Sequence, residues 1–383
     1  MNSPYLAVAA AMLVTFVLGS VHAFSVFIAP LEALLRLPRA EISLIYSLAL
    51  VALTVSVLVG YRIYHRLAPA SLVLLTCLAA AAGTALAALV PAWWALCVGY
   101  SLVFGLSNGI GYGYCLQLAG RVMPRRRGFA MGAVTATYAV GSVVFAKVFA
   151  WRIAAAGVDA ALFAVAAALL AGGAAAALML RASGASYGLP GAPNVADDST
   201  AGSGVAIFWL AYLGAVFAGL MAIGHAAGIA LSRDATPQLA TGAAVAAGIG
   251  SALGGFVAGW MIGRWGSGRL LVGLPLLSAV ALLAMAVHED AFGTVMLLSL
   301  VGFAYGSLIA VYPVAIAERY RTQGPRVYGR VFTAWGCAGL AGPWSAGWIF
   351  DWRGGYETAL LAAAGIALLS SLCARAIRPA SNA

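Results

Sequence analysis

Three ionisable side chains lie inside long apolar runs of the chain, where a charge is costly unless it has a task. His22 is in the stretch VLGSVHAFSVF, His225 is in LMAIGHAAGIA, and Lys147, the single lysine, is in GSVVFAKVFAWR. A histidine changes charge near neutral pH, so either one could attract an anion or carry protons. The alternative for each is a neutral ring that hydrogen-bonds a neighbouring helix. Lys147 could hold an anion if it turns inward, or reach the lipid headgroups if it turns outward.

Neutral polar and aromatic side chains form a second group of candidates. Asn108 and Tyr112 are four residues apart, which places them on one face of a helix. Tyr305 and Trp335 lie in apolar runs of the second half. Such side chains could bind the polar groups of a substrate between aromatic walls, or could join neighbouring helices by hydrogen bonds.

Patterns typical of catalysis or metal binding are missing from the sequence. It contains no nucleotide-binding loop, no nucleophile triad and no Cys/His metal spacing, and no Asp or Glu lies deep in an apolar run. The five cysteines all fall in apolar runs, as small packing residues do. We therefore expect no enzyme activity, cofactor or metal, and we expect transport to be driven by gradients of ions or substrate.

The elements that must position these residues are membrane-spanning helices. Hydrophobic residues make up 63% of the chain and charged residues 8%, whereas a soluble domain has about 25% charged residues. The apolar runs are about 20 residues long, the length that crosses a hydrocarbon core. The first run lacks a basic leader and a cleavage site, so we expect it to be retained. The sequence predicts an all-α membrane protein with twelve spans, at about 5–28, 41–62, 70–90, 93–119, 128–150, 158–180, 205–230, 237–262, 269–288, 290–316, 326–350 and 355–375.

The two halves of the chain repeat each other. SLVFGLSNGIGYGYCLQLAGR from Ser101 aligns without gaps with SLVGFAYGSLIAVYPVAIAER from Ser299, and MGAVTATYAV from Met131 aligns with YGRVFTAWGC from Tyr328. The segment RASGASYGLPGAPNVADDSTAGSG has the composition of a flexible linker. We predict a six-helix bundle at 1–180, a linker at 181–204 and a second bundle at 205–383. This is the plan of a secondary transporter whose halves move around a central site.

The arginines indicate how the chain is oriented. One side of the predicted membrane carries Arg36, Arg39, Arg152, Arg233 and Arg353, and the other carries the remaining fifteen arginines. The positive-inside rule then places both termini and the linker in the cytoplasm. Because topology accounts for the net charge of +10, we expect no nucleic-acid partner.

The chain resembles the major facilitator superfamily over essentially its whole length. The loop GWMIGRWGSGR resembles the family motif G-x-x-x-D-R-x-G-R-R, with Gly263 in place of the acidic residue. The stretch GSVHAFSVFIAPLEALLRLPRAEISLIYSLAL resembles the first two helices of the oxalate/formate antiporter and monocarboxylate porter-like branch, with His22 where that pattern often has tyrosine. GYG at 111–113, MPRRRGFAMG and YGRVFTAWGCAGLAGP resemble further segments of the branch. The resemblance implies that spans one, four, seven and ten line a central cavity.

The anion-binding residues of that branch are not all present. The resemblance implies a lysine in span eleven and an arginine in span eight for oxalate transporters, but this chain has Trp335 in span eleven and no basic residue in span eight. The span-one lysine and the span-eight Asp/Arg pair of monocarboxylate porters are missing as well. Oxalate or lactate therefore cannot be assigned to this chain by name.

We expect a monomeric secondary transporter of the bacterial inner membrane that moves a small organic solute by alternating access, by proton coupling or exchange. A carboxylate anion is the first choice of substrate, with efflux of a neutral or amphipathic molecule, or a non-transporting receptor, as alternatives. His22 and His225 are the predicted proton-coupling residues. The predicted substrate-binding residues are His22, Asn108, Tyr112, Lys147, His225, Tyr305 and Trp335.

Overall fold

The computed structural model describes residues 3–60, 62–187, 202–288, 290–320 and 324–377. Every regular element in these ranges is a helix, and the chain divides into two units, Met1–Pro193 and Asn194–Ala383. The division falls inside the predicted linker at 181–204, much of which lies outside the described residues.

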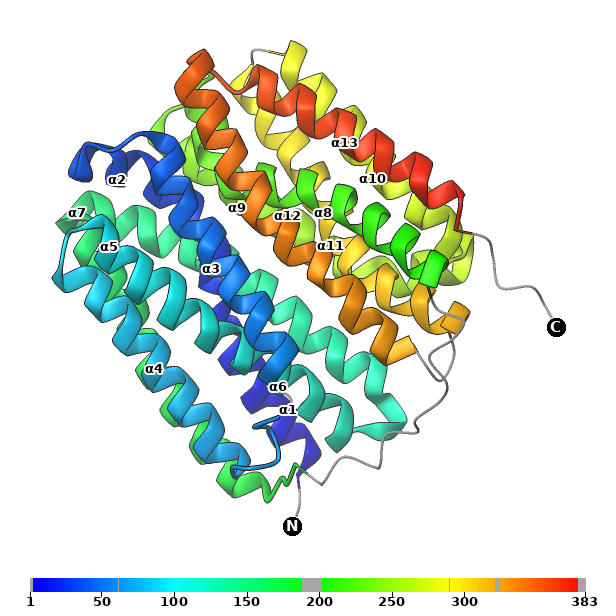
Figure 1. Ribbon diagram of the computed structural model, residues 1–383. Helices are drawn as coiled ribbons and strands as arrows, with labels where there is room; N and C mark the ends of the chain where they lie inside the picture. Colours follow the sequence, from blue (N-terminus) through cyan, green and yellow to red (C-terminus); the bar gives the residue numbers. More distant parts are fainter. Residues whose placement is uncertain (1–2, 61, 188–201, 289, 321–323, 378–383) are drawn as a thin grey trace. The chain divides into compact units, whose positions relative to one another are not determined.

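The N-terminal unit runs from blue to green in Figure 1. Ser3 caps its first helix by accepting a hydrogen bond from the Leu6 amide at 3.3 Å, and Pro4 occupies the first turn, where its missing N–H costs nothing. The elements are α1 (Pro4–Leu18), η1 (Gly19–Phe27), α2 (Ile28–Leu35), α3 (Arg39–Gly60), α4 (Pro69–Leu89), α5 (Trp93–Leu96), η2 (Cys97–Phe104), α6 (Gly105–Val122), η3 (Pro124–Arg126) and α7 (Arg127–Ser183).

Two spans of this unit change helix type within the predicted membrane. The first span passes from α-helix into the 3-10 helix η1, and the fourth contains the π-helix η2. Such changes within a span often mark a functional hinge. The hydrophobic pattern predicts both spans but neither change of helix type.

A single glycine separates the fifth and sixth predicted spans. Gly157 lies within α7 with φ 90° and ψ 178°, a left-handed conformation that favours glycine. The residues on either side of it form the two predicted spans at 128–150 and 158–180.

The C-terminal unit runs from green to red in Figure 1. Thr236 caps its second helix by accepting a hydrogen bond from the Leu239 amide at 3.3 Å. The elements are α8 (Gly202–Leu231), α9 (Pro237–Trp265), α10 (Ser267–Val287), α11 (Ala291–Tyr320), α12 (Gly324–Arg353) and α13 (Glu357–Arg375).

Ten stretches of the described chain are long and apolar enough to cross a membrane. One of them, residues 129–183, holds the two predicted spans that Gly157 separates. The predicted eleventh span lies in α12, which is 30 residues long but carries charged side chains near both ends and is not among the ten. Twelve spans result when the stretch at 129–183 is counted as two spans and α12 is added to the ten.

Glycines let helices of the C-terminal unit approach backbone to backbone. A Cβ atom on Gly306 of α11 would lie 1.9 Å from the Ser251 carbonyl oxygen of α9, and one on Gly254 of α9 would lie 2.1 Å from the Phe303 oxygen of α11. Small residues of this kind mark close helix packing in membranes. The glycine string of α9 therefore serves packing, as its composition suggests.

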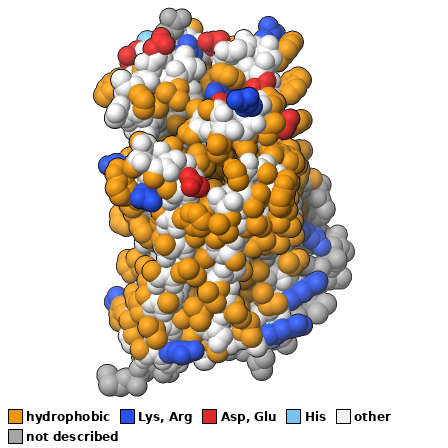
Figure 2. Space-filling model, turned by 90° about the vertical axis from the view of Figure 1, so that its left-hand side faces the viewer, with side chains coloured by type: hydrophobic (Ala, Val, Ile, Leu, Met, Phe, Trp, Pro, Cys, Tyr) orange, Lys and Arg blue, Asp and Glu red, His pale blue; other side chains and the backbone are white. Residues whose placement is uncertain are grey.

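Figure 2 shows hydrophobic side chains covering most of the middle of one face of the molecule. In this view lysine and arginine side chains lie in both the upper and the lower part, whereas the visible carboxylates lie in the upper part.

Candidate functional site

His22 lies in η1, the 3-10 segment of the first span. Its Nδ1 atom is 2.8 Å from the Tyr46 hydroxyl of α3, and its ring meets the Tyr138 ring of α7 edge-on, with centroids 5.5 Å apart. Phe24 stacks on Tyr46 with centroids 5.5 Å apart and the ring planes nearly parallel, at 7°. Tyrosines of α3 and α7 thus hold the imidazole of His22, and Phe24 packs against one of them.

Asn108 of α6 fixes the start of that 3-10 segment. The side chain is fully buried; its Nδ2 atom donates to the Leu18 carbonyl at 2.7 Å, and its Oδ1 atom accepts from the Tyr138 hydroxyl at 2.9 Å. Leu18 is the last residue of α1, and helix ends need partners for their free carbonyls. Asn108 supplies such a partner where the α-helical pattern of the first span stops.

Tyr112, one turn after Asn108, completes this group. Its ring packs on Tyr138 with centroids 4.9 Å apart, and its hydroxyl is 3.5 Å from the Thr135 hydroxyl. We call His22, Tyr46, Asn108, Tyr112 and Tyr138 the N-terminal cluster.

The N-terminal cluster joins three predicted residues through two that sequence reasoning missed. Tyr138 contacts all three of His22, Asn108 and Tyr112, and Tyr46 bonds the first of them. The internal repeat held a signal for Tyr138, because its alignment pairs Tyr138 with Trp335, a predicted site residue.

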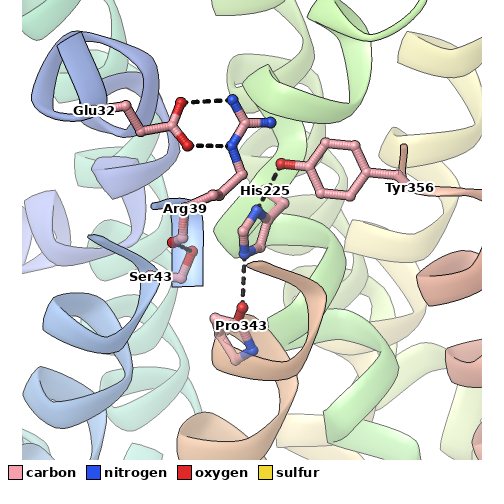
Figure 3. A network of polar contacts seen from close by, with 6 residues as sticks. All are labelled: Glu32, Arg39, Ser43, His225, Pro343 and Tyr356. Carbon is pink, nitrogen blue, oxygen red and sulfur yellow. Dashed lines mark hydrogen bonds and ion pairs between the residues drawn. The ribbon is translucent and has the colours of Figure 1, made fainter. Parts of the chain in front are cut away.

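His225 of α8 is fully buried and hydrogen-bonded through both ring nitrogens. Nε2 is 2.8 Å from the Pro343 carbonyl of α12, and Nδ1 is 2.8 Å from the hydroxyl of Tyr356, the residue that precedes α13 (Figure 3). Because a carbonyl can only accept, this geometry assigns a proton to Nε2. In the neutral ring, the Tyr356 hydroxyl then donates to Nδ1. His225 therefore ties α8 to α12 and to the start of α13.

Tyr305 of α11 and Trp335 of α12 also bond each other. Trp335 Nε1 donates to the Tyr305 hydroxyl at 2.9 Å, and Phe332 stacks on Trp335 at 5.6 Å. Gly219 of α8 makes room for the Tyr305 ring, since a Cβ atom there would come within 2.5 Å of it.

The two units use the same pairing. Asn108 and Tyr138 are 30 residues apart, and so are Tyr305 and Trp335. The sequence repeat already aligns Tyr138 with Trp335. Each unit thus joins its fourth and fifth spans by a buried polar bond, with Tyr305 one residue before the position that the repeat aligns with Asn108.

Lys147 is separate from both groups. Its side chain is exposed on α7, and it makes no hydrogen bond or ion pair with the described residues.

Arg39 and Glu32 form an ion pair that the sequence did not predict. Arg39 Nε lies 2.5 Å from Glu32 Oε1, and Nη2 lies 2.6 Å from Oε2, so the pair is bidentate (Figure 3). Ser43 donates to the Arg39 carbonyl at 2.7 Å. The pair closes the turn between α2 and α3.

The N-terminal cluster offers binding chemistry and one group that can change charge. Its hydroxyls and amide can donate and accept hydrogen bonds, and its imidazole can be protonated. Within the described ranges, no group of three His, Cys, Asp or Glu side chains could hold a metal ion.

Comparison with known proteins gives the fold. The family model described as Major Facilitator Superfamily matches residues 208–383. A solved structure of a mutant of the nucleoside transporter NupG covers 98% of this chain and 100% of its own, with a TM-score of 0.71 and 16% identity. The xylose transporter XylE from E. coli, in a partially occluded inward-open conformation, covers 99% of both chains with a TM-score of 0.75 and 14% identity. No curated protein sequence matches this chain.

These findings agree with the predicted fold class and with the expectation of a transporter rather than an enzyme. The two solved structures cover both halves of the chain at low identity, so they carry the fold and leave the substrate open. The protein is an all-α integral membrane protein with the fold of the major facilitator transporters.

Proposed function

We propose that this protein is a secondary active transporter that moves a small organic solute by alternating access. The fold, the match of residues 208–383 to the Major Facilitator Superfamily model and the transporters of similar structure support this proposal. We further propose a monomer in the bacterial inner membrane with both termini in the cytoplasm, as the arginine distribution suggests.

A carboxylate anion is the substrate class that we propose first. The observation that carries it is the bond between His22 and Tyr46 inside the N-terminal cluster, where an ionisable ring lies among neutral hydrogen-bonding groups. Protonated His22 would attract an anion, and the hydroxyls and amide nearby would orient it. The similarity to the oxalate/formate and monocarboxylate porter-like branch supports the same class.

The partner of His22 tolerates both protonation states. A phenol can donate to a neutral ring nitrogen or accept from a protonated one, so the contact with Tyr46 survives a change of charge. Proton uptake and release at His22 would therefore leave this contact in place. We propose His22 as the residue that couples proton movement to transport.

His225 keeps a place in the proposal mainly as a positioning residue. Both of its ring nitrogens are already in hydrogen bonds, to Tyr356 and to Pro343. A substrate would have to displace one of these partners. We propose that His225 contributes to transport by holding α8 against α12 rather than by taking up a proton.

The remaining predicted residues have distinct proposed roles. Tyr112 and Trp335 would contact the apolar part of the solute. Asn108 and Tyr305 would orient their hydrogen-bond partners, Tyr138 and Trp335. Lys147 is exposed, and we propose it as an outer contact for the anion.

The experiment is uptake into liposomes by the purified full chain. Radiolabelled mono- and dicarboxylates are screened under an imposed pH gradient and in counterflow. We expect flux of at least one carboxylate, with an apparent affinity that falls as pH rises and His22 loses its proton. The His22→Gln variant should lose this pH dependence, whereas His225→Gln should keep it. A preparation competent in counterflow of another solute but inactive with every carboxylate would overturn the anion assignment.

A neutral or amphipathic solute is the second candidate. The aromatic and uncharged majority of the N-terminal cluster favours it, and the named substrates of the similar structures are a nucleoside and xylose. In that case flux in the same assay should persist at high pH and should not respond to His22→Gln.

A further inference from the structure

A groove runs between α9 and α10 in the C-terminal unit, with Phe303 of α11 among its lining residues. Its volume is about 520 Å³, within the range of ligand-binding pockets. The helices leave this space because α9 packs chiefly against α11, α10 packs chiefly against α13 and next against α11, and α9 and α10 make little contact with each other. Gly266, in a left-handed conformation with φ 79°, is the only residue between them.

The groove has an apolar body and one charged end. Its lining is hydrophobic apart from Arg269, which lies in the first turn of α10. Trp260 and Trp265 are exposed, with ring centroids 5.6 Å apart. Tryptophan beside arginine at the end of a membrane helix is typical of the headgroup level of a bilayer.

A second cavity of about 800 Å³, lined by apolar and charged side chains, adjoins the first. The two share Trp265, Arg269 and Gly273. The second is lined by Arg269, Arg319 and Arg375 against a single carboxylate, Glu318, which accepts a hydrogen bond from Ser267. Its lining is therefore net positive, and this charge lies next to the hydrocarbon-like surface of the groove.

We propose that these two cavities form a binding site for one anionic phospholipid. An acyl chain would lie in the groove along Trp260, Leu270 and Leu274, and the phosphate would lie beside Arg269 and Arg375. Only a lipid presents a long apolar chain next to a negative group, and basic pockets between helices on the cytoplasmic side bind such headgroups. A free phosphate would use the arginines and leave the groove empty. The site is separate from the N-terminal cluster, so its failure would leave the transport proposal untouched.

Gly273 gives a sharp way to block the site. It lines both cavities, and a Cβ atom built on it meets nothing within 4 Å. A Gly273→Phe substitution should therefore fill the groove without disturbing helix packing. Gly365 of α13 has the same open surroundings and lines neither cavity, so Gly365→Phe is the matched control.

The experiment measures lipid binding to the purified full chain in detergent by native mass spectrometry. The probes are phosphatidylglycerol, phosphatidylcholine with identical acyl chains, and inorganic phosphate. We expect the wild type and Gly365→Phe to retain phosphatidylglycerol in preference to phosphatidylcholine, and Gly273→Phe to lose that preference. Arg269→Gln should weaken phosphatidylglycerol binding about fivefold, the factor for the ~1 kcal/mol that an arginine contributes near an anionic headgroup.

Circular dichroism and gel filtration check that each variant is folded. The Arg269→Gln variant removes the positive charge and leaves the groove open, so it tests the contribution of charge separately. Equal binding of the two lipids by the wild type would overturn the proposal. So would unchanged phosphatidylglycerol binding by Gly273→Phe, or competition by inorganic phosphate at equal concentration.

Discussion

At the scale of single residues, the two histidines show how similar sequence contexts lead to different surroundings. His22 bonds a phenol and packs against a second one, in a segment of 3-10 helix. His225 is fully buried between a phenol and a backbone carbonyl, near the C-terminal end of the regular α-helix α8. The same side chain thus has a tyrosine hydroxyl as its hydrogen-bond partner in one place, and joins three helical segments in the other.

The hydrogen bonds by which His225 joins α8 to Tyr356 and to α12 lead to a prediction about stability. Tyr356→Phe removes the hydroxyl that bonds Nδ1 of His225 and keeps the aromatic ring in place. Hydrogen bonds between membrane helices contribute about 0.6 to 1.7 kcal/mol, so we expect the melting temperature in detergent to fall by about 1–7 °C. The pH dependence of transport should stay as in the wild type. If Tyr356→Phe removed that dependence, as His22→Gln is expected to do, His225 would be the proton-coupling residue.

The Asn108–Tyr138 bond can be tested by a double-mutant cycle. Asn108→Ala and Tyr138→Phe each remove the same contact, so their effects on the free energy of unfolding should not add. We expect a coupling of about 0.6 to 1.7 kcal/mol, measured by thermal unfolding in detergent. Tyr138→Phe paired with Tyr305→Phe is the control, since these residues share no bond. Additive effects of Asn108→Ala and Tyr138→Phe would contradict the geometry.

At the scale of elements, glycines decide how closely α9 and α11 pack. Gly306→Ala would place a methyl group 1.9 Å from the Ser251 carbonyl oxygen, so α9 and α11 would have to separate. Overpacking of this kind costs about 1–3 kcal/mol. Gly259 lies on α9 with nothing within 4 Å of an added Cβ, so Gly259→Ala should be neutral or stabilise by up to about 1 kcal/mol.

The comparison of these two alanines separates packing from helix propensity. Both substitutions raise propensity equally, and only Gly306→Ala meets a backbone atom. Thermal unfolding of the two variants in the same detergent gives the answer. Equal melting temperatures would mean that the close approach of α9 and α11 is absent.

Hydropathy predicts the spans well because length and apolar content are what a bilayer selects. The third predicted span, 70–90, is the helix Pro69–Leu89, and the split at Gly157 falls between predicted spans five and six. The 3-10 segment η1 could not be predicted in this way. Its start is held by Asn108, which is 90 residues away along the chain from Leu18, and local pattern carries no record of such a contact.

The candidate site was predictable in part, because polar residues are conspicuous in runs that a bilayer otherwise selects to be apolar. His22, Asn108 and Tyr112 stand out as polar residues in apolar runs, and they do lie close together through Tyr138. Tyr46 was missed because it lies near the start of its span, where a tyrosine is ordinary. Its contact with His22 depends on how α3 packs beside η1, which residue type alone does not specify.

At the scale of the whole molecule, the internal repeat is visible in both sequence and structure. The polar pairs Asn108–Tyr138 and Tyr305–Trp335 both join the fourth and fifth spans of their units, within one residue of equivalent positions, and His22 packs against the first pair. If His22 is the proton-coupling residue, as we propose, the two halves share a scaffold while one of them carries the group that takes up protons.

Orientation in the membrane is the last prediction and follows from the arginine count on the two sides of the chain. Arg264 and Arg269 flank the turn between α9 and α10, which should face the cytoplasm, whereas the turn between α8 and α9 should face outward. Gly268→Cys and Gln238→Cys place a thiol at exposed positions next to these turns, in the first turns of α10 and α9, in a background whose five native cysteines are alanine. A maleimide that cannot cross membranes should label Gln238→Cys in intact cells and Gly268→Cys only after permeabilisation. The reverse labelling pattern would mean that the chain has the opposite orientation. Both termini would then face outward, and the proposed lipid site would lie in the outer leaflet.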